Sequence, residues 1–250
     1  MKEIEGQVAL SDLHIKEIPE ILNGIKIRGN FLFVRNRITS LKNCPEIVLG
    51  LFNISMNRRL KSLVGGPKQV NGIIADDCAL TSLDGIPKLI NGQYGNPGPI
   101  SVANNRLTSL RGLPSESVKF LDINDNPITS LEGCPKLIKG DFTANNTLIK
   151  NMIGGPKVVN GNVQLIDTKL DSIEGFPTYI GGNLLIGGTP LAKRIFPGPA
   201  ASFNLVMDSK KLIQEINSKC TIDGDIYEYE DDVPANREND YIEMEPQEEW

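Results

Sequence analysis

Apolar and polar residues follow one another in the same short order along most of the chain. The clearest unit begins at Val118: apolar residues stand at its positions 1, 4, 6, 11 and 14, and Asn126 stands at position 9. Leu121 and Ile123, at positions 4 and 6, alternate with the polar Asp122 and Asn124, as expected for a short strand with one buried face. Each unit therefore predicts one strand followed by a turn.

The units recur in register with a proline. The prolines that end the units, together with Pro19 before them, are 26, 22, 20, 27, 21, 21 and 21 residues apart from Pro19 to Pro177. Seven segments end on these prolines: ITSLKNCP (38–45), LKSLVGGP (60–67), LTSLDGIP (80–87), LTSLRGLP (107–114), ITSLEGCP (128–135), IKNMIGGP (149–156) and LDSIEGFP (170–177). Because one unit cannot bury its apolar face alone, about eight stacked units predict one continuous core.

Asparagine marks the predicted turn after the strand. Asn36 and Asn105 occupy the place of Asn126, and counting back from the next proline puts Asn57 one place early. Cys78, Thr147 and Thr168 occupy this place in other units. An amide side chain here can bond backbone groups that the turn leaves unpaired.

This pattern resembles leucine-rich repeats (LxxLxLxxNxL), most closely the short bacterial form whose units read LxxLPxLPxxLxxLxVxxN, over residues 8–200. The resemblance implies a curved solenoid with a parallel β-sheet on its concave face and mostly loops and turns on its convex face. Such repeats are scaffolds for binding and do not specify a partner. Units with the LTSLxGxP signature also resemble those of bacteriophage and bacterial proteins, which implies a viral origin as one option and, by analogy, a host or defence protein as target.

Four segments are predicted along the chain. Residues 1–30 form an irregular N-terminal cap and first unit, and residues 31–205 form the repeat solenoid. Residues 206–220 form a capping helix with an apolar stripe, since Leu212, Ile213 and Ile216 follow the polar Asp208 at helical spacing. Residues 221–250 form an acidic tail.

The longest unit carries an insertion rich in glycine and proline, residues 91–99. This composition predicts a loop at the edge of the solenoid. Insertions in repeat arrays mark either a binding edge or a tolerated surface loop, and both interpretations stay open.

Residue chemistry argues against an enzyme. His14 is the only histidine, and no serine or cysteine motif places a nucleophile beside it. Isolated carboxylates such as Asp76, Asp122 and Asp141 are expected to be solvated rather than to hold a cation. We therefore expect no catalytic site, no metal and no cofactor.

The cysteines are expected to be free. Cys44 and Cys134 occupy the same repeat position four units apart, roughly 19 Å at the spacing of stacked strands, which is too far for a disulfide. We expect both to be small buried core residues. With no CxxC spacing, no run of 18 apolar residues and no secretory leader, a cytoplasmic protein without a membrane span is expected.

The outward positions of the predicted strands form the candidate partner-binding surface. Positions 5 and 7 of each unit point away from the core, onto the concave face. The residues chosen are Leu32, Val34, Met56, Ile74, Asp76, Asp122, Asn124, Thr143, Asn145 and Ile166. The first units are apolar here, the middle ones are polar and the last ones turn apolar again, so exposed apolar patches are expected towards both ends. The alternative is permanent cover by an N-terminal segment or a neighbouring chain.

The net charge of −5 hides a split between tail and body. Residues 221–250 hold 12 acidic residues and one arginine, whereas the rest of the chain has a net charge of +6. The charge and the absence of a repeat predict that this tail is disordered in isolation. Its candidate binding residues are Tyr227, Tyr229, Tyr241, Ile242 and Trp250. Three hypotheses stay open for the tail: it binds a partner, it folds back on the basic body, or it is inert.

These observations favour a non-enzymatic protein-binding module that inhibits, sequesters or scaffolds a protein partner. The alternative is a structural component, in a virion or another assembly, so a homo-oligomer is also considered. Nucleic-acid binding is disfavoured because no basic run interleaved with aromatic residues is present.

Overall fold

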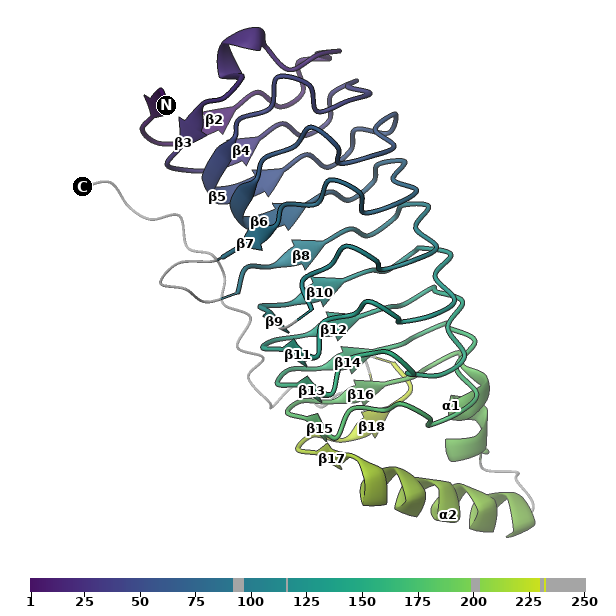
Figure 1. Ribbon diagram of the computed structural model, residues 1–250. Coiled ribbons are helices and arrows are strands. Elements are labelled where there is room, and N and C mark those ends of the chain that lie inside the picture. Colours follow the sequence, from purple (N-terminus) through teal and green to yellow (C-terminus); the bar gives the residue numbers. More distant parts are fainter. Residues whose placement is uncertain (92–96, 116, 199–202, 230–231, 233–250) are drawn as a thin grey trace.

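The chain folds into a parallel β-solenoid (Figure 1). The computed structural model describes residues 1–91, 97–115, 117–198, 203–229 and 232. Paired residues in successive turns, Leu121, Phe142, Val163 and Leu184, follow one another at 21-residue intervals. The repeat predicted from the prolines is therefore one turn of the solenoid.

Each turn passes through two strand positions, which stack into two columns. The first strand column contains β1 (Glu3–Ile4), β3 (Lys26–Ile27), β7 (Leu89–Ile90), β9 (Ser117–Val118), β11 (Leu137–Ile138), β13 (Val158–Val159), β15 (Tyr179–Ile180) and β17 (Thr221–Ile222). The second strand column contains β2 (Val8–Ala9), β4 (Phe31–Leu32), β8 (Ile100–Ser101), β10 (Leu121–Asp122), β12 (Phe142–Thr143), β14 (Val163–Gln164), β16 (Leu184–Leu185) and β18 (Ile226–Tyr227).

Two longer strands join the columns near the N-terminus. β5 (Ile47–Asn53) and β6 (Gln69–Ile74) pass through both columns, with a register shift after Val48. Within the described residues they produce one 13-stranded sheet, while β9 to β17 form a separate five-stranded sheet. The sequence pattern predicted one strand per unit, which is incomplete, because the two-residue strands of the first column are too short to show an alternation.

Stacked glycines form the corner between the two columns in the C-terminal turns. The N–H of Gly161 donates to the carbonyl of Gly140, that of Gly182 to Gly161, and that of Gly224 to Gly182, at 3.0–3.1 Å. A Cβ on Gly182 would lie 2.9 Å from the backbone of Gly161 and 2.5 Å from Asn162 Oδ1. Since side chains would collide there, these C-terminal turns stack closely because the corner residue is glycine.

The residue after each corner glycine links one turn to the next. The N–H of Asn162 donates to Asp141 Oδ1 at 2.6 Å, and that of Asn183 donates to Asn162 Oδ1 at 2.8 Å. The backbone N–H of Asp225 continues the series by donating to Asn183 Oδ1 at 3.1 Å. These side chains supply acceptors where the backbone bends away from the ladder.

The asparagine after the second strand acts as predicted. Asn126 is 2% exposed, its Nδ2 donates to the carbonyls of Val102, Ile123 and Asn124, and its Oδ1 accepts the Leu107 N–H at 2.9 Å. Asn36 and Asn105 make equivalent bonds. Thr147 and Thr168 replace them with hydroxyl groups that donate to the carbonyl three residues earlier. The backbone polar groups of the buried turn thus find hydrogen-bond partners in an amide side chain or, less completely, in a hydroxyl group.

The prediction that Asn57 stands one place early is wrong. Phe31 pairs with Phe52, which puts Asn57 in register with Asn36. The extra residue of the 22-residue interval lies after this asparagine, where Arg58 and Arg59 stand in place of the single Arg37. Counting back from Pro67 included this extra residue, so the predicted turn position fell one residue after Asn57.

The core runs without interruption through the solenoid, from Ile18 to Cys220. It is mostly aliphatic, with a cluster of rings near the N-terminus, where Phe31 stacks on Phe33 and Phe52 with centroids 5.7 and 5.6 Å away. Cys44 and Cys134 are buried and free, which confirms the expectation for both.

Helices lie near both ends of the solenoid. η1 (Glu20–Leu22) belongs to the first turns. Near the C-terminus, α1 (Pro190–Ile195) begins with Thr189, whose hydroxyl accepts the Ala192 N–H at 2.9 Å. This helix was not anticipated, although a threonine followed by proline is a common helix start.

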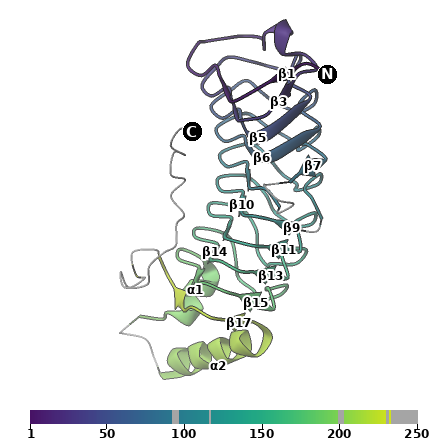
Figure 2. The ribbon, with the colours of Figure 1, turned by 90° about the vertical axis from the view of Figure 1, so that its left-hand side faces the viewer.

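The predicted C-terminal helix is present and longer than expected. α2 (Phe203–Lys219) buries Leu212 and Ile216, and it lies across the end of the solenoid (Figures 1 and 2). Among the described residues, no helix is long and apolar enough to span a membrane.

Residues 221–229 continue the solenoid beyond α2. β17 pairs with β15, and β18 pairs with β16, both in parallel. The predicted tail boundary at residue 221 is therefore corrected: these residues form a further turn. The signal was present in the sequence, because Ile222-Asp-Gly224-Asp-Ile226 repeats the order of Ile180-Gly-Gly182-Asn-Leu184.

We predict that Asn126→Ala lowers the free energy of unfolding by about 2–4 kcal/mol, because several buried backbone groups lose their partner. Asn126→Thr is the matched variant, since threonine occupies this position in later turns, and it should cost about 1 kcal/mol. Urea denaturation followed by circular dichroism measures both. Equal losses for the two variants would contradict the role of the side-chain hydrogen bonds.

We predict that Gly182→Ala lowers the free energy of unfolding by about 1–3 kcal/mol, because the new methyl group collides with the preceding turn. Thr81→Ala, at an exposed position, serves as the control for a small surface change. Thermal melting compares them, and an unchanged melting temperature for Gly182→Ala would show that the corner has spare room.

Candidate binding surface

The outward side of the second strand column carries two parallel rows of side chains, which we call the sheet face. Strand register gives the first row as Leu32, Asn53, Ile74, Ser101, Asp122, Thr143, Gln164, Leu185 and Tyr227. The second row, two residues further along each turn, is Val34, Ser55, Asp76, Ala103, Asn124, Asn145, Ile166, Gly187 and Tyr229. The face therefore extends along nearly the whole solenoid.

Nine of the ten residues predicted for this surface lie on the two rows. Each of them is partly exposed: Leu32, Val34, Ile74, Asp76, Asp122, Asn124, Thr143, Asn145 and Ile166. They come from five turns within a run of seven but share one face, because the second-column strands pair in parallel and in register.

Met56 does not lie on these rows, which corrects its assignment. It stands at the turn before Asn57 with φ of 61°, in register with Arg35, which has φ of 54°. Asn53 and Ser55 occupy the outward positions of that turn. The displacement has the same cause as the misplaced Asn57.

The apolar end of the face is consequently smaller than predicted. Leu32, Val34 and Ile74 are partly exposed, and the polar Asn53 and Ser55 stand between them. At the opposite end Leu185 is only 2% exposed, so it adds little apolar surface. The partly exposed apolar contribution near that end comes from Ile166 instead.

The polar residues in the middle of the face bond to neighbouring turns. Asn145 Oδ1 accepts the Ile166 N–H at 2.7 Å, and Asn124 Oδ1 accepts the Asn145 N–H at 2.6 Å. In the N-terminal half, Asp76 accepts the Ala103 N–H at 2.8 Å and the Ser101 hydroxyl at 2.7 Å. These three side chains stabilise the stack and have part of their hydrogen-bonding capacity occupied.

Burial affects both aspartates of the face. Desolvation raises the pKa of Asp76, while the bonds from Ser101 and the Ala103 N–H lower it and the charge of Asp122 raises it. Desolvation also raises the pKa of Asp122, opposed chiefly by the Asn124 N–H. The ionised carboxylates are therefore less favourable here than in water.

Two of the predicted tail residues belong to the face. Tyr227 follows Leu185 in the first row, and Tyr229 follows Gly187 in the second. Tyr229 is 46% exposed, and the Glu228 carbonyl together with the Tyr229 ring leaves no room for a Cβ on Gly187. Tyr241, Ile242 and Trp250 lie outside the described residues.

Other candidate chemistry in the described part of the chain is limited. No cluster of three or more potential metal ligands occurs there. Desolvation raises the pKa of Cys78 and of Cys134 to about 12, and that of Cys220 to about 11. These thiols are poor nucleophiles, since the reactive species is the thiolate.

A cavity of about 420 Å³ lies between α1 and α2. Its charged lining is mixed: Lys193, Arg194, Asp208, Lys211 and Glu215. Because both cations and carboxylates line it, the cavity indicates no particular class of ligand.

Comparison with known proteins does not assign the chain to a family. Its sequence matches no family model, and no curated protein is significantly similar to it.

We predict that Asp76→Asn melts at a higher temperature than the natural protein at neutral pH. The folded-state pKa of Asp76 is raised, so its contribution to stability is present at low pH and is lost as the pH rises through that pKa. The amide keeps an acceptor for the Ala103 N–H and carries no charge. Thermal melting between pH 3 and pH 8 should show a difference that grows with pH.

Asp76→Ala separates charge from hydrogen bonding. It removes both, so it should lower the melting temperature relative to Asp76→Asn at every pH. A neutral-pH melting temperature of Asp76→Asn below that of the natural protein would mean that the ionised carboxylate stabilises this face.

Proposed function

We propose that this protein is a non-enzymatic binding module of the leucine-rich-repeat type, which inhibits, sequesters or scaffolds a protein partner held on its sheet face. The observation that carries the proposal is the sheet face itself. Two rows of side chains from parallel strands, most of them at least partly exposed, run along one side of a solenoid with a continuous buried core.

The leucine-rich-repeat assignment is supported by the turn after the second strand. Asn36, Asn105 and Asn126 occupy the asparagine position of the LxxLxLxxNxL pattern, and each bonds carbonyls of its own and the preceding turn. In this assignment the second strand column is the concave sheet, and the side away from it is the convex one.

The distribution of chemistry along the face supports protein recognition. Apolar Leu32, Val34 and Ile74 lie at one end, Ile166, Tyr227 and Tyr229 lie towards the other, and hydrogen-bonded polar groups separate them. Tyrosine contributes strongly to protein interfaces because it combines a large apolar ring with a hydroxyl group. We propose that these two ends provide the main contacts.

Self-assembly is the second candidate function, and the ends of the sheets favour it. Among the described residues, β1 and β2 pair on one side only, as do β17 and β18. Strand edges of this kind can pair with another chain. A structural component would stack such copies end to end.

Paired substitutions test the binding proposal. Leu32→Asp with Ile74→Asp places charges on the sheet face, and Val64→Asp with Ile153→Asp places the same charges on exposed apolar residues elsewhere, at 61% and 54% exposure. Proteins captured from a lysate by the natural protein should be lost with the first pair and kept with the second. For a purified partner, the first pair should weaken affinity about tenfold or more.

Loss of the partner with both pairs, or with neither, would contradict binding through the sheet face. Light scattering over a range of concentrations addresses the second candidate. Association that grows with concentration and is unaffected by the sheet-face pair would favour self-assembly through strand edges.

A further inference from the structure

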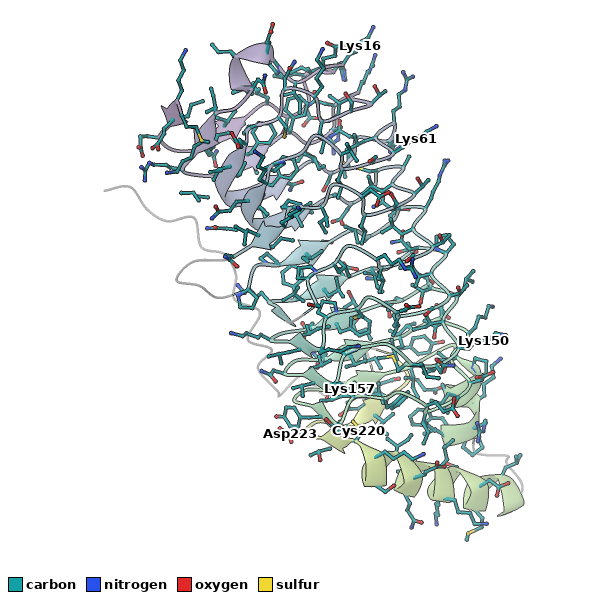
Figure 3. The ribbon with its side chains drawn as sticks, viewed as in Figure 1. Lys16, Lys61, Lys150, Lys157, Cys220 and Asp223 are labelled. Carbon is teal, nitrogen blue, oxygen red and sulfur yellow. The ribbon has the colours of Figure 1, made fainter. Side chains whose placement is uncertain are left out.

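A band of residues on the side of the solenoid opposite the strand columns is basic, with exposed carboxylates flanking it at Asp84, Asp125, Glu132, Asp167 and Glu174. We call it the loop side: residues 14–16, 37–40, 58–62, 79–82, 106–109, 127–130, 148–151 and 169–172. It carries eight cations and one carboxylate, Asp171, for a net charge of +7. The cations are Lys16, Arg37, Arg58, Arg59, Lys61, Arg106, Lys150 and Lys169, all exposed. Figure 3 shows Lys16, Lys61 and Lys150 along this side, with Lys157 and Asp223 on the strand side.

These loop-side cations have no partner within the described part of the chain. None of the eight side chains makes an ion pair or hydrogen bond there. Several cations near the strands are paired, as Lys26 and Arg28 are with Glu3 and Lys68 is with Glu46. Residues 79–82 and 127–130 carry no charge, but where adjacent turns both carry cations, like charges spaced by about 4.8 Å per turn repel one another. A bound polyanion would relieve that repulsion.

The chain leaves the last strand at the corner that leads to the loop side. In the preceding turn, Gly187 is followed by Thr189 and then by α1, which begins on the loop side. Tyr229 occupies the position of Gly187. Its N–H donates to Asp232 Oδ2 at 3.0 Å, and its carbonyl accepts the Asp232 N–H at 3.2 Å. The described chain therefore ends, at Asp232, near the corner that leads to the loop side.

The sequence of residues 233–250 complements this side. It contains six acidic residues and one arginine, together with Tyr241, Ile242, Met244 and Trp250. Eighteen residues can span roughly 60 Å when extended. From the turn of Lys169 to that of Lys16 is seven turns, about 34 Å. The segment is long enough to reach every cation of the row.

We infer that residues 233–250 bind to the loop side of their own chain as an acidic strap. The strap neutralises the row of cations and competes there with other polyanions, while the sheet face on the strand side is left for a partner. This inference rests on the charges of the loop side and does not require the proposed function.

Trp250, the only tryptophan, reports the strap in the full-length protein. Its quenching by acrylamide, a neutral molecule, should be about twofold or more weaker in the natural protein at low salt than in a synthetic 233–250 peptide. Salt near 0.5 M should raise quenching towards the peptide value, because screening weakens the attraction.

Charge reversal locates the binding side. Arg37→Glu, Lys61→Glu and Arg106→Glu together should make Trp250 as accessible as in the peptide at any salt concentration. Lys88→Glu, Lys119→Glu and Lys157→Glu make the same charge change at exposed positions on the strand side and should leave Trp250 protected. Circular dichroism checks that both triple variants are folded, and glutamine replacements serve if reversal disturbs folding.

Three results would overturn the inference. Trp250 could be as accessible in the natural protein as in the peptide, or the strand-side triple variant could expose it as much as the loop-side one. Alternatively, an added oligonucleotide could bind the loop side of the natural protein without changing Trp250 quenching, which would identify an external polyanion as the ligand.

Discussion

The whole structure depends on each turn presenting its backbone polar groups to the turns on either side. Strands of only two residues cannot hold a sheet by their own length, so the ladder must be completed at the corners. Asp141, Asn162 and Asn183 do this between the strand columns, and Asn126 and its equivalents do so after the second strand. The side-chain amides and carboxylates act as part of the backbone network, which fixes the turn length and the direction of the outward rows.

Much of this architecture could be predicted from the sequence, because the stacking requirement repeats in every turn. Asn126 with Leu121 and Ile123 was sufficient to predict a buried-face strand and its turn. The first strand column was missed, because two-residue strands such as Leu137–Ile138 are too short to show an alternation of apolar and polar residues. Residues 221–229 were assigned to a tail because the acidic character of the segment outweighed the shorter signal of Gly224 and its neighbours.

The candidate face was predictable in position but not in chemistry. Alternation places Asn124 and Asn145 outward, yet it does not reveal that each accepts an N–H from the next turn. That bond depends on the register between turns, which is a property of the stack and not of one unit. Met56 shows the same limit, since one extra residue after Asn57 changed which side chains point outward. The two sides of the solenoid thus differ: the sheet face is constrained by its own hydrogen bonds, whereas the loop-side cations are not.

The insertion between β7 and β8 shows how the stack accommodates a longer turn. Asn91 and Pro97 face each other in an isolated antiparallel bridge, so the chain leaves the ladder and returns at nearly the same point. β8 then pairs with β6 and β10 in the register of the other turns. A peptide epitope or a small reporter grafted between Asn91 and Pro97 would thus leave the pairing of the adjacent turns unchanged.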